Sequence, residues 1–154
     1  MPVTSRAFIK ASVVYLCLGA LLGALMLING WIPLDSHIYA LRDSHVAMLV
    51  VGWLTQLIVG VAWWLLPPLK IGLVSGSSHP VRRGQAQRGS EPLFWATFAF
   101  LNAGVLLESA GKPLAVWSGL QAFRSLAETS DLLLLVAAAS FVVNMWKRVR
   151  ALGR

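Results

Sequence analysis

The chain has 154 residues, of which 57% are hydrophobic and 12% charged, and its mean hydropathy is +0.70. Soluble domains carry about 25% charged residues, so the composition excludes an ordinary soluble protein and favours one transmembrane domain over residues 1–154. The single cysteine, Cys17, excludes an intrachain disulfide and is expected in the core. The formal net charge of +7 could indicate a nucleic-acid-binding protein. Whether it does depends on where the charged residues lie in the sequence.

Four apolar stretches are long enough to cross a bilayer, which takes about 20 helical residues. Arg6 and Lys10 precede the first stretch as in a signal peptide, but the apolar run is too long for one and no Ala-x-Ala site ends it. Because lipid cannot satisfy open backbone groups, the predicted fold class is all-α, a bundle of four transmembrane helices. We expect these helices at about 8–30, 45–67, 92–111 and 119–147.

The basic residues predict the orientation. Ten of the thirteen fall in the N-terminal segment, the loop 69–91 and the C-terminal tail, whereas the outer side holds only Arg42, Lys112 and Arg124. Since cytoplasmic loops are enriched in Lys and Arg, both termini and the 69–91 loop should be cytoplasmic (N-in/C-in), in the inner membrane of a prokaryote. Topology thus accounts for the basic excess without nucleic acid. His79, in the Gly- and Ser-rich 69–91 loop, is expected to be solvated.

Most of the other ionisable residues converge at the outer level of the membrane. Arg124, Glu128 and Asp131 are spaced by four and three along one helix face, and Glu108 ends helix three at the same level. Charges in spanning segments are functional candidates by default. Two interpretations stay open: Arg124 pairs with Glu128 or Asp131 to hold helices together, or Arg124 or Arg42 neutralises an acidic group of a cofactor, such as a haem propionate.

Helix 45–67 has a stripe on one face at about 100° per residue, consisting of His45, Met48, Leu49, Gly52, Gln56, Gly60, Trp63 and Pro67. Its glycines suit helix–helix packing or the approach of a flat cofactor, and Gln56 needs a buried partner. His45, with Asp43 and Ser44 as expected helix caps, is the candidate ligand. Gly52, Gln56 and Trp63 would complete a cofactor face.

The segment HVAMLVVGWLTQLIVGVAWWLLP, residues 45–67, resembles the second transmembrane helix of subunit I of the haem-copper oxidases and nitric-oxide reductases. In that family a histidine opens the helix at the outer side, small residues follow, and a proline closes it. The resemblance implies that His45 is an axial ligand of a low-spin haem, with Gly60 and Pro67 matching the family's glycine and proline. The family's other ligands are absent, including the His-x-x-x-Tyr copper site, so one chain lacks a complete binuclear centre.

The same family suggests an assembly. Its subunit I contains twelve helices in three pseudo-symmetric groups of four. A four-helix chain that resembles one group could rebuild this architecture as a homotrimer, because closed cyclic symmetry is usual for homo-oligomers.

Whether His37 supplies a second ligand depends on the outer loop, expected at 31–44. In one continuous helix the rings of His37 and His45 would lie about 12 Å apart along the axis, too far apart to share one iron. A short surface helix after Pro33 would instead let His37 fold back toward a haem on His45, in the same protomer or in a neighbour.

The leading hypothesis is a cytochrome b-like membrane protein that holds haem b non-covalently. It would transfer electrons from quinol or to a periplasmic carrier, or bind a diatomic gas. One alternative is a copper- or zinc-binding membrane protein; its candidate ligands are His37, His45, Glu108, Glu128 and Asp131. The other is a structural or assembly subunit of a respiratory complex. The sequence contains no Ser/His/Asp arrangement, P-loop or Cys-x-x-Cys-His motif, so no catalytic residue is assigned and turnover by one chain is not expected.

Overall fold

In a computed structural model, residues 1–68 and 89–151 are described, and all of their secondary structure is helical. Four helices (η1, α2, η2 and α3) follow one another without interruption and are called here the second span, Ser36–Leu65. Most of the loop expected at 69–91, including His79, lies outside the described residues. The elements are α1 (Val3–Trp31), η1 (Ser36–Leu41), α2 (Arg42–Ala47), η2 (Met48–Thr55), α3 (Gln56–Leu65), α4 (Glu91–Ser118) and α5 (Gln121–Ala151).

Four helical segments are long and apolar enough to cross a membrane: α1, the second span, α4 and Gln121–Trp146 within α5. The predicted all-α class with four membrane-length helices is therefore confirmed, and it indicates a multi-pass membrane protein. Large apolar side chains remain exposed along these segments, as expected for surfaces that face lipid. Cys17 is also exposed, so its expected place in the core is wrong.

The first connection is shorter than predicted, because only residues 32–35 leave the helical conformation between α1 and η1. The Asn29 side-chain oxygen accepts hydrogen bonds from the backbone N–H groups of Leu34 (2.9 Å) and Asp35 (3.0 Å). Asp35 in turn accepts one from the N–H of His37 at 2.8 Å and caps η1. The helix therefore begins at Ser36, and Asp43 and Ser44 lie within the second span instead of capping it.

The second span changes helix type along its length. The 3₁₀ helix η1 passes into the α-helix α2, and η2 is a π-helix over Met48–Thr55 before α3 resumes α geometry. The Thr55 hydroxyl donates to the carbonyl of Val50 within this wider turn, at 2.9 Å. π-helical segments are rare and often lie at functional sites. Here the π-helix follows directly after the turn that carries His45.

α4 and α5 form the second hairpin. Ser90 caps α4 by accepting from the N–H of Leu93 at 3.4 Å. α4 continues past the expected end at residue 111 and stops at Ser118, where Gly119 adopts φ 68°, the left-handed conformation that commonly ends helices.

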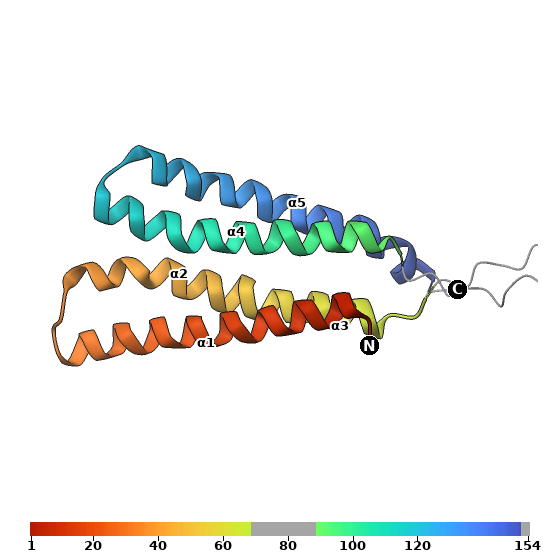
Figure 1. Cartoon of the computed structure of the whole chain (residues 1–154), viewed down its shortest axis with the longest axis horizontal. Coiled ribbons are helices and arrows are strands. Elements are labelled where there is room, and N and C mark those ends of the chain that lie inside the picture. The colour runs from red at the N-terminus through yellow and green to blue at the C-terminus, as the bar shows by residue number, and fades with distance from the viewer. Residues whose placement is uncertain (69–88, 152–154) are drawn as a thin grey trace, which may run out of the picture.

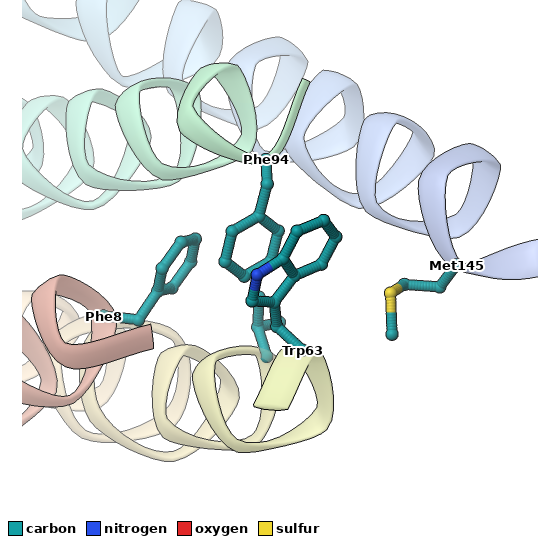
Figure 2. Close-up of a cluster of buried hydrophobic side chains, with 5 residues drawn as sticks. Phe8, Trp63, Phe94 and Met145 are labelled. Carbon is teal, nitrogen blue, oxygen red and sulfur yellow. The ribbon is translucent and has the colours of Figure 1, made fainter. Parts of the chain in front are cut away.

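The helices lie in the order α1, second span, α4, α5, with α1 and α5 at the two edges (Figure 1). An aromatic cluster joins all four at the end where the chain begins. Phe94 stacks on Phe8 at 4.5 Å and on Trp63 at 4.1 Å between ring centroids, and Met145 of α5 reaches the same cluster (Figure 2). The far end, with both hairpin turns, carries the polar residues considered next.

Candidate functional site

His45 lies in α2 with its ring held against α1. Its Nδ1 is 2.7 Å from the carbonyl oxygen of Gly19. Because a carbonyl oxygen only accepts, Nδ1 carries the proton and donates it, which leaves the lone pair on Nε2. Gly23, one turn further along α1, makes room for the ring, since a Cβ there would lie only 2.6 Å from Cε1 of His45.

This arrangement is the one in which histidines bind metals. Metal-ligating histidines usually donate their second ring N–H to a carbonyl or carboxylate, which fixes the tautomer and raises the basicity of the ligating nitrogen. Within the described part of the chain, Nε2 of His45 makes no hydrogen bond. The hydrogen bond to Gly19 therefore leaves Nε2 as the ring nitrogen with a free lone pair among the described residues.

His37 is not brought to His45 within one chain. It is exposed in η1, where its Nδ1 lies 2.7 Å from a carboxylate oxygen of Asp35. The hydrogen bonds from the backbone and ring of His37 lower the pKa of the Asp35 carboxyl. The second span is helical from Ser36 onward, so the two histidines are separated by at least about 12 Å along the axis.

The glycines of the stripe pack against α1. A Cβ on Gly52 would meet the Tyr15 ring at 2.6 Å, and a Cβ on Gly60 would meet Phe8 at 2.7 Å. Of the two interpretations that the sequence left open for these glycines, the structure shows helix packing.

The two larger residues of that stripe, Gln56 and Trp63, are buried among other helices. Gln56 donates to the Asn102 side chain of α4 at 3.4 Å, while its own Oε1 has no partner in the described part of the chain. Trp63 stacks in the aromatic cluster at the opposite end of the second span from His45. Neither side chain is placed beside the His45 ring by any contact in the described residues.

A polar cavity of about 350 Å³ opens at the end with the hairpin turns, lined from α2, α4 and α5. Lys112 is its central cation and lies 2.8 Å from Glu108 and 3.9 Å from Asp43. The cavity is lined by Asp43, Lys112, Ala115, Val116, Arg124, Ala127, Glu128 and Asp131. The predicted convergence of charge is therefore present, with Lys112 in the pairing role expected of Arg124.

Arg124 lines this cavity without an ion pair to Glu128 or Asp131, and Arg42 is exposed and also unpaired among the described residues. Nor do the described residues contain any group of three His, Cys, Asp or Glu side chains close enough to hold a metal ion. Glu108, Glu128 and Asp131 thus do not assemble into the alternative metal site within one chain.

Sequence reasoning missed the contacts that one helix makes with another. Gly19 and Gly23, which hold His45, form a small-x-x-x-small pair in α1 that could have signalled a close helix contact. Arg148 was counted with the basic tail, yet it is buried and its Nη2 donates to the carbonyl oxygens of Trp63, at 3.2 Å, and of Leu66. No sequence pattern distinguishes Arg148 from its basic neighbours.

The comparisons with known proteins add no relative. No protein-family model matches the chain, and no curated protein or solved structure is significantly similar to it.

Proposed function

We propose that the chain is a haem b-binding, cytochrome b-like integral membrane protein, similar to one four-helix group of oxidase subunit I. The observation that carries this proposal is the His45 ring: Nδ1 donates to the Gly19 carbonyl at 2.7 Å, and Nε2 has no hydrogen-bond partner among the described residues. An axial histidine in this setting would hold the iron of a non-covalent haem, which supplies one-electron redox chemistry or a site for a diatomic gas.

The chain's own residues have separate roles in this proposal. Gly19 fixes the tautomer of His45, and Gly23 leaves space for its ring. Arg42 and Arg124 have no ion pair among the described residues, so either guanidinium group would be free to bind a propionate. His37 is too far along the same helix to share the iron, so in this proposal a second histidine ligand comes from a neighbouring copy, or the position stays open.

The proposal also includes the setting of the protein. The chain would lie N-in/C-in in the prokaryotic cytoplasmic membrane as a homotrimer and exchange electrons with quinol or a periplasmic carrier. Copper and zinc are less well supported, because no three described His, Cys, Asp or Glu side chains lie close enough together to hold one metal ion. If no haem binds, the remaining alternative is that the chain is a structural or assembly subunit of a respiratory complex.

The visible spectrum of the protein purified after haem-replete expression tests the proposal. We expect a Soret band in the spectrum of the protein and sharp α and β bands after reduction. The haem content should not exceed about one haem per chain, because each chain contributes one His45. His45→Ala should abolish the Soret band while keeping the elution volume of the wild type, and His79→Ala serves as the matched control that retains it. His37→Ala should keep the Soret band and alter the α and β bands only if His37 of a neighbour is the second ligand. Wild-type protein without a Soret band, or His45→Ala with an unchanged one, contradicts the proposal.

A further inference from the structure

The four helices form a row, and α5, at one edge, has its main contacts with α4. α5 packs on α4, and α1 packs mainly on the second span, at opposite edges of the molecule (Figure 1). Only 17% of the spanning part of each edge helix is buried, against 33% for the two inner spans. Between the second span and α5 lies an apolar hollow of about 410 Å³ over α4, so these two helices are separated there and meet only near Arg148 within the described residues.

The exposed face of α5 is unsuited to lipid at its outer end. Glu128 and Asp131 are both exposed there, and Asp131 lies two helical turns, about 10 Å, deeper than Arg124 in the first turn. Neither carboxylate has an ion pair within 4 Å among the described residues. Both carboxylates line the polar cavity that also contains Lys112 and Arg124, and they remain exposed at its rim, where charges open to hydrocarbon are costly. A further cation at this rim would therefore stabilise them.

The second span has a complementary face. Arg42 is exposed at its outer end without an ion pair in the described part of the chain, and three large apolar residues follow it at intervals of four: Val46, Val50 and Leu54. On α5, Glu128 and Asp131 are followed in the same direction by the exposed Leu132 and Leu135. Both helices run from the hairpin turns toward the aromatic cluster, so each face begins with charge and continues with apolar residues (Figure 1).

We propose that the Arg42–Val46–Val50–Leu54 face of one copy packs against the Glu128–Asp131–Leu132–Leu135 face of a second copy. The guanidinium of Arg42 would lie between the two carboxylates, where Arg forms strong charge-assisted pairs. Each contact joins the second-span face of one copy to the α5 face of the next, so the interface is heterologous. Every copy can therefore bind two neighbours, and the contacts repeat until a ring closes. This interface deepens the self-association in the proposed function and does not depend on haem; because it uses Arg42, it leaves Arg124 as the residue for a propionate.

Disulfide cross-linking tests which faces meet. In a Cys17→Ser background, Val46→Cys/Leu132→Cys should give covalent oligomers up to the size of the ring after oxidation in membranes, and a reductant should reverse them. Val46→Cys alone should stay monomeric, as should the matched pair Leu21→Cys/Leu132→Cys, whose Leu21 is exposed on α1. Cross-linked dimers from Val46→Cys alone would show a symmetric contact and overturn the proposal, as would a double variant that stays monomeric.

Charge reversal tests the ion pair by native mass measurement in detergent. Arg42→Glu and Glu128→Arg should each reduce the oligomer to monomer, and the double variant Arg42→Glu/Glu128→Arg should restore it. Arg6→Glu, an exposed cation at the other end of the molecule, should change nothing. An Arg42→Glu variant that stays assembled, or wild-type protein that carries a different polypeptide or only lipid in place of a second copy, overturns the interface. The Soret band is read in the same samples, so failure of the haem proposal and failure of the interface are distinguished.

Discussion

Gly23 lies within the regular helix α1, so no turn requires a glycine at this position. A glycine is needed because it has no side chain. The His45 ring occupies the space where a Cβ would stand, 2.6 Å from Cε1. The Gly19 carbonyl then binds Nδ1. Two residues of α1 thus decide both the position and the tautomer of a histidine 22 or more positions away in sequence.

Gly23→Ala should displace the His45 ring and destabilise the protein by about 1–3 kcal/mol, the usual cost of overpacking. Gly30→Ala is the matched control on the same helix, since its Cβ would lie 3.8 Å from the nearest atom, the Tyr39 hydroxyl. Thermal unfolding in detergent should show a lower Tm for Gly23→Ala only, and a weakened Soret band if haem is bound. Equal Tm values for the two variants would mean that the ring is not confined as described.

At the scale of elements, Arg148 explains how the second span ends. The last carbonyl groups of a helix have no partner within it. The Arg148 side chain from α5 donates to the carbonyl oxygens of Trp63, Leu66 and Pro67, and its guanidinium lies 5.3 Å from the centroid of the Trp63 ring. One side chain thus joins the end of the first hairpin to the second hairpin.

Arg148→Ala should lower the free energy of unfolding by at least about 1.5–3 kcal/mol, the worth of one hydrogen bond from a charged donor. Arg148→Lys should recover only part of it, because an ammonium group lacks the planar fork that reaches several acceptors. Arg6→Ala removes an exposed cation at the same end and is the control. Unfolding by denaturant in mixed micelles measures all three, and an Arg148→Ala variant as stable as Arg6→Ala would exclude a capping role.

For the whole molecule, hydropathy was sufficient to predict the number and class of the helices, because each spanning segment is set by its own apolar residues. Contacts between helices were not predictable in this way. These contacts depend on how each helix is rotated against its neighbour. Examples are the pairing of Lys112 with Glu108 and Asp43, the hydrogen bond from His45 to Gly19, and the burial of Arg148. The early start of the second span depends likewise on Asn29, which binds backbone groups five and six residues away.

The orientation in the membrane is still a prediction, and the fold makes it testable on the full chain. Five of the six carboxylates, namely Asp35, Asp43, Glu108, Glu128 and Asp131, lie toward the end with the hairpin turns, whereas Arg6, Lys10 and Arg148 lie toward the other end. His37 and Glu91 are exposed at the two opposite ends. In a Cys17→Ser background, His37→Cys should react with a membrane-impermeant maleimide in intact spheroplasts.

Glu91→Cys should react only after the spheroplasts are lysed, because positive-inside topology places the start of α4 in the cytoplasm. The Cys17→Ser protein without an added cysteine gives the background. The reverse pattern, in which Glu91→Cys is labelled in intact spheroplasts, would show that the chain has the opposite orientation in the membrane. It would place the His45 end and its polar cavity on the cytoplasmic side, where a periplasmic electron carrier could not reach it.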